Sequence, residues 1–445
     1  MRFEQWLSKI QLHQVKQNRL ETWKKSDLQN IYQQLSKILI ECKEGSLIYL
    51  ALKDQRLLLL SILVCLDCNL HPIPEYEYSI DSDKDFIKNH LNPAYFLHYK
   101  NKRFVKSESK SGKIQWNAEP GIIFQTSGSS GIPKFVHQPL SHLLYNAQVA
   151  AERQAMDELT RALIPLTLSH TGGLNMQTLP ALYSGGSIEF VDKRAPSQMH
   201  KRLFSGSITH AVLVPNHLRQ ALSAKKWLQE DFVNNLKVLT GSCPVDYHLF
   251  SEVNKRGGKL LSVYGLTEIG PFLSCQDKGI PPKKGQAVLG QFQKAYKYRI
   301  GSDQQIEVMG PTAGSYLSLV ENNYIVTSCG EPWVKTGDLG IEVNGQLEFF
   351  GRINRQINFA GFKFYPEEVE ACLLLLPEVH FCRVYGLADP VYNQLPAVDI
   401  VGDFKEVSVL KNHLKKHLHP LKVPKVWNIV EQIGLTSIDK VSGNF

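Results

Sequence analysis

The chain of 445 residues is too long for one hydrophobic core, so two or more domains are expected. Its content of 43% hydrophobic and 21% charged residues excludes a disordered protein and indicates a globular one. The net charge of +8 is modest for this length. It suits an anionic ligand such as a nucleotide, whereas nucleic-acid binding usually requires a concentrated basic patch.

Residues before 120 alternate helical and strand patterns. Apolar residues have helical spacing over 27–42, and 46–52 predicts a short buried strand with a helix after it over 54–66. A further strand is predicted over 92–98. This alternation is typical of an α/β domain. The basic stretch 100–113 mixes Lys and Arg with Ser, Glu and Gly. We interpret it as a solvated loop and expect no nucleic-acid partner.

Short apolar segments continue the strand pattern through the middle of the chain. We expect strands at 121–125, 161–166, 187–191, 210–214, 237–239 and 259–263. From Ile300 the pattern becomes β-rich, with Gly and Asn between the segments. After Gly351-Arg352 a compact α/β unit follows, with expected helices over 367–375 and 407–417 and a strand over 379–385.

The N-terminus lacks the apolar core of a signal peptide. The longest apolar run, 57–66, is interrupted by Ser61 and is too short to span a bilayer. We therefore expect a cytoplasmic protein with no membrane span, whose eight cysteines are thiols. Cys65 and Cys68 form a CxxC pair, but no second ligand pair for zinc lies nearby. They are interpreted as buried structural thiols.

A Gly- and Ser-rich loop follows the expected strand 121–125 and ends in Pro-Lys. Glycines allow backbone amides to turn inward around an anion, hydroxyls add donors, and a lysine adds a cation for a polyphosphate. The common P-loop differs, because it carries a second glycine before its lysine and Ser or Thr after it. The alternative is a flexible turn. The expected phosphate-binding residues are Thr126, Ser127, Gly128, Ser129, Ser130, Gly131 and Lys134.

This loop resembles the phosphate-loop signature of the adenylate-forming superfamily, which comprises acyl-CoA synthetases, peptide-synthetase adenylation domains and luciferases. Further motifs stand in the order of that family. They are Tyr264-Gly-Leu-Thr-Glu268, Thr336-Gly-Asp-Leu-Gly340, Gly351-Arg352 followed by Gly361-Phe-Lys-Phe-Tyr-Pro-Glu-Glu-Val-Glu370, and a lysine near the C-terminus. The resemblance covers residue 46 to the end.

The resemblance implies an α/β fold: a large multi-layer N-terminal domain, 1–351, and a small mobile C-terminal α/β lid, 352–445. The family activates a carboxylic acid with ATP and passes the acyl group to a thiol. The lid is expected to rotate between the two half-reactions, bringing Lys440 into the site for adenylation and the Gly361 loop for thiol attack. Its hinge residue, Asp or Lys in the family, is Asn354 here.

Attack of a carboxylate on ATP places negative charge on the α-phosphate and on the departing pyrophosphate. Catalysis therefore needs a magnesium ion and fixed donors. The resemblance implies that Glu268 binds Mg²⁺, that Thr267 bonds the α-phosphate, and that Tyr264 stacks on adenine. A carboxylate is a suitable hard ligand for this ion. The alternative for 264–268 is a strand-to-helix turn with a capping Thr.

The remaining nucleotide contacts are also implied by the resemblance. Gly241 and Ser242 match the loop on the adenine side, Asp338 the acceptor of the ribose hydroxyls, and Arg352 the ribose-contacting arginine before the hinge. The alternative is an ordinary loop for Gly241 and Ser242, and a turn-forming Asp for Asp338. For Arg352 it is a surface ion pair. Lys440 matches the catalytic lysine, with Lys422 and Lys425 as rival positions and a solvated tail lysine as the alternative.

The acid pocket is the least defined part of the site. His170 matches a family histidine at its mouth, although a core histidine is the alternative. No acidic residue occurs between Leu163 and Leu182, which disfavours an α-amino acid. The lid and the closing Lys-Val-Ser resemble the o-succinylbenzoate–CoA ligases, and so does the segment 209–215. An aromatic or medium-sized acid is therefore expected, with o-succinylbenzoate as first candidate. Its polar contacts would come from Asn175, Gln177, Asn216, His217 and Arg219.

The sequence thus predicts an AMP-forming acid–thiol ligase that uses ATP, Mg²⁺ and CoA. The first alternative acceptor is the phosphopantetheine arm of an acyl carrier protein. A non-catalytic nucleotide-binding relative is the alternative from another class, and the near-complete set of motifs argues against it.

Overall fold

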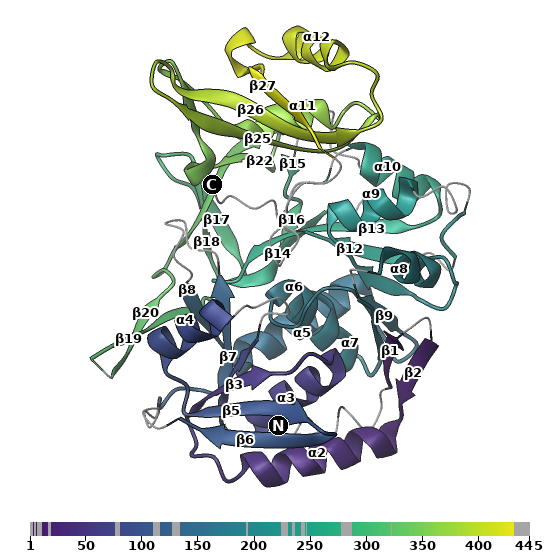
Figure 1. Ribbon diagram of the computed structural model, residues 1–445, viewed down its shortest axis with the longest axis vertical. Coiled ribbons are helices and arrows are strands. Elements are labelled where there is room, and N and C mark those ends of the chain that lie inside the picture. The colour runs from purple at the N-terminus through teal and green to yellow at the C-terminus, as the bar shows by residue number, and fades with distance from the viewer. Residues whose placement is uncertain are drawn as a thin grey trace.

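A computed structural model of the chain describes residues 3, 6, 11–16, 19–75, 81–109, 116–126, 134–192, 195–223, 230–233, 236–241, 245, 247–276, 287–321 and 323–430. Five sheets are formed within this part of the chain. Figure 1 shows the C-terminal sheet at one end of the long axis and the helix α2 (Lys25–Leu39) at the other.

The largest sheet has nine strands in the described ranges, in the order β16-β14-β13-β12-β11-β9-β10-β1-β2. The run from β13 to β1 is parallel, whereas β14, β16 and β2 pair antiparallel. Its strands are β1 (Leu12–Lys16), β2 (Arg19–Trp23), β9 (Arg161–Ile164), β10 (Ser187–Phe190), β11 (His210–Val212), β12 (Lys237–Thr240), β13 (Lys259–Leu266), β14 (Gly270–Gln276) and β16 (Gln291–Phe292).

Three smaller sheets complete the N-terminal region. One has the order β4-β3-β5-β6, with β4 (His71–Pro74), β3 (Leu47–Ala51), β5 (Tyr95–Lys100) and β6 (Arg103–Glu108). The next has the order β20-β19-β8-β7, with β20 (Asn323–Ser328), β19 (Ser315–Val320), β8 (Lys134–Pro139) and β7 (Gly121–Thr126). The last has the order β15-β22-β21-β18-β17, with β15 (Ala287–Val288), β22 (Gln346–Arg352), β21 (Val334–Val343), β18 (Gln305–Met309) and β17 (Lys297–Ile300).

Helices pack against these sheets. The helix α3 (Gln55–Asp67) is apolar on all sides and buried from Arg56 to Leu66, as expected for a helix enclosed in a core. Its N-cap Asp54 accepts a hydrogen bond from the Arg56 amide. The other helical segments of this region are α4 (Asp81–Leu91), α5 (Leu140–Gln154), α6 (Thr171–Gly173), the π-helical turn η1 (Leu174–Thr178), α7 (Leu179–Tyr183), α8 (Pro196–Leu203), α9 (Pro215–Ser223) and α10 (Tyr247–Lys255).

The C-terminal sheet has its own hydrophobic cluster, which includes Val369, Val384, Ile400 and Leu410. The large N-terminal region and the small C-terminal α/β unit confirm the expected fold class. The boundary at 351/352 and the mobility of the lid stay predictions. The elements of this unit are η3 (Ile353–Arg355), β23 (Ile357–Phe359), β24 (Phe362–Phe364), α11 (Pro366–Leu373), β25 (Val379–Asp389), β26 (Asn393–Gly402), α12 (Val407–His417), η4 (Pro420–Lys422) and β27 (Val426–Ile429).

One interpretation of the basic stretch was wrong in part. Residues 103–108 form β6, which pairs antiparallel with β5, because apolar Phe104 and Val105 give this stretch enough strand character.

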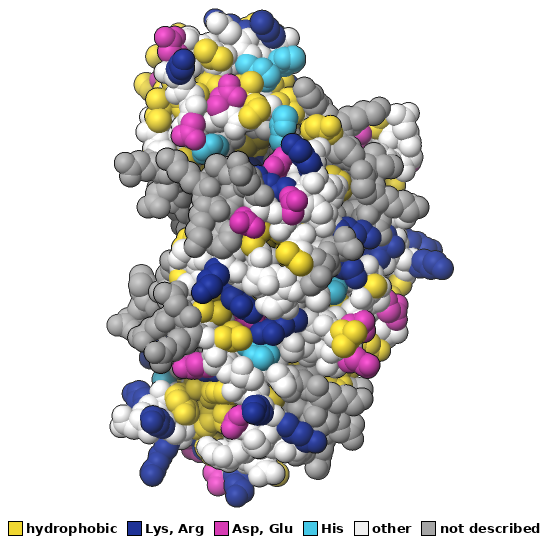
Figure 2. All heavy atoms as spheres, turned by 90° about the vertical axis from the view of Figure 1, so that its right-hand side faces the viewer, with side chains coloured by type: hydrophobic (Ala, Val, Ile, Leu, Met, Phe, Trp, Pro, Cys, Tyr) yellow, Lys and Arg dark blue, Asp and Glu magenta, His cyan; other side chains and the backbone are white. Residues whose placement is uncertain are grey.

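Within the described residues, the cysteines are free thiols and no helix is long and apolar enough to cross a membrane. On the face shown in Figure 2, lysines and arginines lie in several separate places among acidic side chains.

Candidate active site

Asp338 and Arg352 face each other across the antiparallel pair β21–β22. Arg352 and Asp338 form an ion pair, with 2.6 Å between Arg352 Nε and Asp338 Oδ1, and the Asp338 side chain is almost fully buried. The backbone around Asp338 is fixed as well. Its amide donates to Thr336 Oγ1 at 3.1 Å, and the amide of Gly337 donates to Gln305 Oε1 at 3.0 Å. Gly337 has a φ of 74°, which glycine adopts without strain.

Tyr264 on β13 reaches the same carboxylate from the largest sheet. Its hydroxyl donates to Asp338 Oδ2 at 3.0 Å. Burial, and next the Asp338 carboxylate, raise the pKa of Tyr264 well above its usual value, so the phenol remains a donor. The structure therefore brings together the predicted adenine- and ribose-binding residues, from motifs 74 positions apart. A carboxylate retains acceptor sites beyond two such donors, so Asp338 can also accept ribose hydroxyls.

Thr267 and Glu268 lie in the turn between β13 and β14, so the motif joins two strands, not a strand and a helix. The carbonyl of Thr267 accepts from Gln138 Nε2 at 2.6 Å. The carbonyl of Glu268 accepts from the amide of Gly314 at 2.8 Å. The turn is thus held from β8 on one side and from the segment before β19 on the other.

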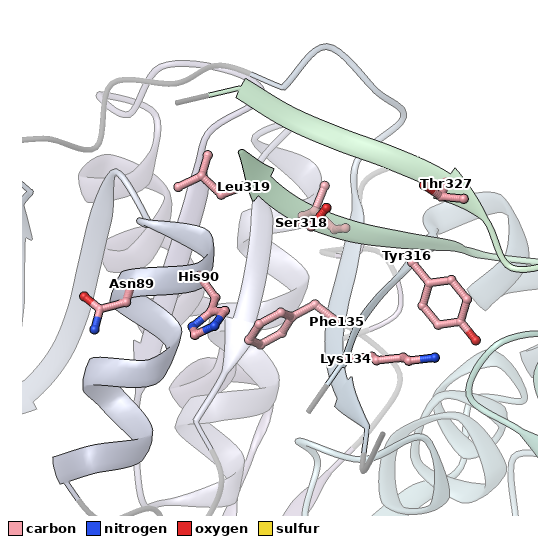
Figure 3. A pocket seen from close by; sticks show the side chains of 9 residues that line it. Asn89, His90, Lys134, Phe135, Tyr316, Ser318, Leu319 and Thr327 are labelled. Atoms are coloured by element: carbon pink, nitrogen blue, oxygen red, sulfur yellow. The ribbon is translucent and has the colours of Figure 1, made fainter. Parts of the chain in front are cut away.

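Lys134 stands at the start of β8, close to Tyr316 on β19. The Lys134 Nζ lies 5.0 Å from the centre of the Tyr316 ring, and the Tyr316 hydroxyl lies 3.4 Å from Glu268 Oε1. Both side chains line a cavity of about 600 Å³ whose far end is formed by Asn89 and His90 on α4. In Figure 3 the Lys134 and Tyr316 side chains extend side by side, away from α4.

The donor set at Glu268 fits a magnesium ion that is shared with a nucleotide. Glu268 is half-buried and offers a hard carboxylate oxygen. No group of three or more His, Cys, Asp or Glu gathers in the described part of the chain. Mg²⁺ is commonly held by one or two carboxylates together with substrate phosphates, so a lone carboxylate beside a cationic lysine is sufficient.

The two described ends of the predicted phosphate loop are neighbours. Thr126 and Lys134 are direct partners in the antiparallel pair β7–β8, and Thr126 Oγ1 donates to the Lys134 carbonyl at 3.4 Å. The strand before the loop is buried, as predicted. The loop residues themselves, Ser127, Gly128, Ser129, Ser130 and Gly131, lie outside the described residues, as does Ser242.

The segments that contain His170 and Gly241 both approach Met176. His170 is the N-cap residue of α6 and is half-buried. Gly241 follows β12, and a Cβ there would be 3.4 Å from the Met176 methyl group and 3.1 Å from Val263. A Cβ on Gly172 would be 3.8 Å from the Met176 sulfur. The predicted acid-side and adenine-side segments therefore pack against one residue of η1.

The π-helical turn η1 contains Asn175 and Gln177, two of the residues that are predicted to contact the acid. Asn175 and Gln177 are fully buried, and no described residue hydrogen-bonds to either end of their amide groups. Gln154 Nε2 donates to the Met176 carbonyl at 3.2 Å. Such π-turns are rare and occur frequently at functional sites. Of the other predicted contacts, His217 is buried on α9, whereas Asn216 and Arg219 are half-buried there.

The segment after Arg352 is fastened to the C-terminal unit by Arg355. Its guanidinium contacts Glu367 Oε1 at 3.0 Å and Glu370 Oε1 at 2.6 Å. Burial raises the pKa of Glu367 to about 7 against the opposing effect of Arg355. Asn354, at the predicted hinge, is exposed. Gly361 has a φ of 86° at the tip of the β23–β24 hairpin, and no atom of the described residues lies within 4 Å of its Cβ position.

The predicted catalytic lysine, Lys440, lies outside the described residues. Its two rivals have partners within the C-terminal unit. Lys422 forms an ion pair with Glu368, and Lys425 Nζ lies 5.4 Å from the centre of the Phe359 ring. Neither of these two contacts involves the residues around Glu268 and Asp338.

Sequence reasoning missed Gln138, Tyr316 and Arg355. Gln138 and Tyr316 belong to no recognised motif, and their neighbours in the fold are distant in the chain. A signal did exist for Arg355, because Glu367 and Glu370 are three residues apart and therefore lie on one face of α11.

Comparison with protein families gives two matches. Residues 72–314 match the AMP-binding enzyme family, and residues 368–440 match the AMP-binding enzyme C-terminal domain. Among curated proteins, an indoleacetate–CoA ligase from Aromatoleum aromaticum is 27% identical over 340 residues, which cover 72% of this chain and 66% of that protein. A 2-succinylbenzoate–CoA ligase from Bacillus licheniformis is 28% identical over 335 residues, covering 73% and 69%. This chain thus spans about two thirds of the length of these relatives.

A solved structure has the same fold over nearly the whole chain. It is the o-succinylbenzoate CoA synthetase from Bacillus subtilis in complex with the acyl-adenylate intermediate OSB-AMP. The TM-score is 0.76 at 20% sequence identity, covering 96% of this chain and 93% of that one. At this identity the likeness concerns the fold alone.

Proposed function

The chain belongs to the AMP-binding enzyme family, and on that premise we propose that it is an acid–thiol ligase that activates a carboxylic acid with ATP. In the first half-reaction an oxygen of the acid attacks the α-phosphorus, the bond to the β-phosphate breaks, and pyrophosphate leaves. In the second, the thiol of CoA attacks the acyl carbon, loses its proton, and displaces AMP.

The observation that carries this proposal is the convergence on Asp338. Arg352 and Tyr264 hold this buried carboxylate from two sheets, and a buried charged acceptor suits the two hydroxyls of a ribose. Lys134 and Glu268 lie on either side of Tyr316, where a cation and a metal-binding carboxylate would meet a polyphosphate. In this proposal Mg²⁺ held at Glu268 would neutralise charge on the phosphates.

The proposed acid is aromatic and carries a hydrogen-bonding group besides the reacting carboxylate. The two relatives described above are named for indoleacetate and 2-succinylbenzoate, both aromatic acids. The amides of Asn175 and Gln177 have no hydrogen-bond partner among the described residues, which supports a polar group on the acid, because buried amides require such partners. We take o-succinylbenzoate as the first acid to test.

The test is a pyrophosphate-release assay over a panel of acids, with and without CoA, followed by mass spectrometry of the thioester. The panel contains o-succinylbenzoate, indoleacetate, substituted benzoates and fatty acids of several lengths. We expect release with an aromatic acid and an acyl-CoA product. Thioester formation only on a carrier-protein phosphopantetheine would transfer the proposal to the carrier acceptor. ATP binding without pyrophosphate release from any acid would favour a non-catalytic relative.

A further inference from the structure

Tyr316 contacts both charged groups of the proposed polyphosphate site. It lies on β19, whose residues 315–317 pair with 135–137 of β8, the strand that begins at Lys134. Its ring lies 5.0 Å from Lys134 Nζ, and its hydroxyl lies 3.4 Å from Glu268 Oε1. A single side chain therefore stands between the cation and the carboxylate, and lines the cavity drawn in Figure 3.

The backbone before Tyr316 fixes its position relative to Glu268. The amide of Gly314 donates to the Glu268 carbonyl at 2.8 Å. A Cβ at position 314 would approach the His137 carbonyl to 2.6 Å, so glycine allows this close crossing of three segments. The backbone of this segment consequently cannot move away from Glu268 without loss of that hydrogen bond.

The charge state of Tyr316 suits both contacts. A phenol is neutral at a pH of about 7, so Tyr316 donates a hydrogen bond to the Glu268 carboxylate. A neutral aromatic ring also attracts an ammonium group through its face. The neighbouring Cys329 remains a thiol, because burial and Glu268 raise its pKa to about 12.

We propose that Tyr316 is a positioning residue for the nucleotide–metal site. Its hydroxyl orients the Glu268 carboxylate toward the metal, and its ring face holds the Lys134 ammonium toward the phosphates. This inference rests on the proposed function for the identity of the ligand, and on the Tyr316 contacts alone for the role of the residue. This role involves no contact between Tyr316 and the acid or the thiol.

Two variants separate the two contacts, and a third is a matched control. Tyr316→Phe removes the hydroxyl and keeps the ring, whereas Tyr316→Leu removes both. Tyr324→Phe removes a phenol from the adjacent strand β20, where the hydroxyl donates to the Leu91 carbonyl at 2.6 Å. ATP affinity is measured by calorimetry for each protein, once with Mg²⁺ and once with EDTA. Thermal unfolding of each variant reports its stability.

We expect Tyr316→Phe to bind metal-free ATP as the wild type does, but to lose about three- to tenfold of the gain in affinity that Mg²⁺ provides. Tyr316→Leu should also weaken metal-free ATP binding, by about two- to fivefold. Tyr324→Phe should lower the unfolding temperature and leave the Mg²⁺ dependence of binding unchanged.

The inference is overturned if Tyr316→Phe has the same Mg²⁺-dependent gain as the wild type, if Tyr324→Phe loses as much of it, or if the wild type shows no gain. Nucleotide binding is measured without any acid. A wild type that binds Mg²⁺-ATP but activates no acid therefore contradicts the proposed function and leaves the role of Tyr316 testable.

Discussion

Arg352 forms an ion pair, at 2.6 Å, with the carboxylate that stands directly opposite it on the neighbouring strand, that of Asp338. This ion pair joins the last residue of β22 to the middle of β21, immediately before the chain turns at 353–355. The predicted ribose acceptor is therefore coupled to the predicted hinge. A nucleotide bound at Asp338 would act on the segment from which the C-terminal unit departs.

Replacement of Asp338 tests the nucleotide site most directly. We expect Asp338→Ala to weaken ATP binding about ten- to hundredfold, because two ribose hydroxyls lose a charged acceptor and Arg352 loses its partner. Calorimetry with ATP measures this loss. Asp403→Ala, which removes an exposed carboxylate that pairs with His380 in the C-terminal unit, is the control and should bind as the wild type does. ATP affinity within twofold of wild type would reduce Asp338 to a turn former.

Replacement of Glu268 tests the metal site. Glu268→Gln should shift the Mg²⁺ concentration for half-maximal adenylation upward by about tenfold, since an amide is a poorer ligand for a hard dication. The matched control is Glu307→Gln, which changes a carboxylate that pairs with Arg299 on β17. A Mg²⁺ titration of Glu268→Gln that superimposes on the wild-type curve would remove this residue from the site.

The role of Lys440 is tested by separating the half-reactions. Lys440→Ala should slow acyl-adenylate formation about a hundred- to thousandfold, because one donor to the developing charge is lost. Thioester formation from supplied acyl-adenylate should be spared. Lys422→Ala and Lys425→Ala are the controls, and the former also breaks the ion pair with Glu368. An unaffected first half-reaction in Lys440→Ala would assign the role to one of these two.

Buried histidines make the fold sensitive to acid. Burial lowers the pKa of His210 from 6.5 to about 4. Its Nε2 lies 3.1 Å from the Gln154 carbonyl and its Nδ1 lies 2.8 Å from Thr209 Oγ1, contacts that a neutral ring satisfies with one donor and one acceptor. The same cause lowers the pKa of His13 and His71 to about 4.

The unfolded chain binds these protons near pH 6.5, and the folded chain does not until about pH 4. Stability is therefore complete above pH 6.5 and falls as the pH decreases from 6.5 toward 4. For His210 the loss is at most about 3 kcal/mol. His210→Gln should reduce the decline of the urea midpoint over this range, whereas His90→Gln, on the surface of α4, should not. Equal declines in wild type and His210→Gln would contradict the assignment.

Much of the fold was predictable because its signals are local. Buried runs such as 121–124 and the apolar helix 55–67 appear where the sequence places them. The hairpin β1–β2 was not predicted, because β1 has mixed polarity and gains its place by pairing with β10, more than 170 residues away along the chain. A strand that depends on such a distant partner has only a weak strand pattern in its own sequence.

The candidate site likewise has a part that the sequence predicts and a part that it does not predict. Tyr264, Asp338 and Arg352 belong to motifs, so the sequence alone identifies them as candidate site residues. Their meeting at one carboxylate required the pairing of β21 with β22 and the approach of β13. Tyr316 has no motif of its own, and its proximity to Glu268 arises from a crossing of segments that only the tertiary structure defines.

The acid is tested by a matched series of substrates and variants of η1. The series comprises o-succinylbenzoate, the keto acid that lacks the ring carboxylate, and 4-phenylbutanoate, which lacks both polar groups. We expect kcat/KM to fall along the series, by about ten- to hundredfold for each group that leaves a buried amide unpaired.

Asn175→Leu and Gln177→Leu should flatten this preference, because the proposed acid site would lose buried amides that have no partner among the described residues and that a polar acid can satisfy. Gln148→Leu is the control, since Gln148 is exposed on α5 and its amide donates to Glu152 at 2.9 Å. It should retain the wild-type order of acids. A wild type that prefers 4-phenylbutanoate or long-chain fatty acids would eliminate the polar aromatic acid. Adenylation itself would stand, because the residues around Asp338 and Glu268 do not contact the acyl chain in this proposal.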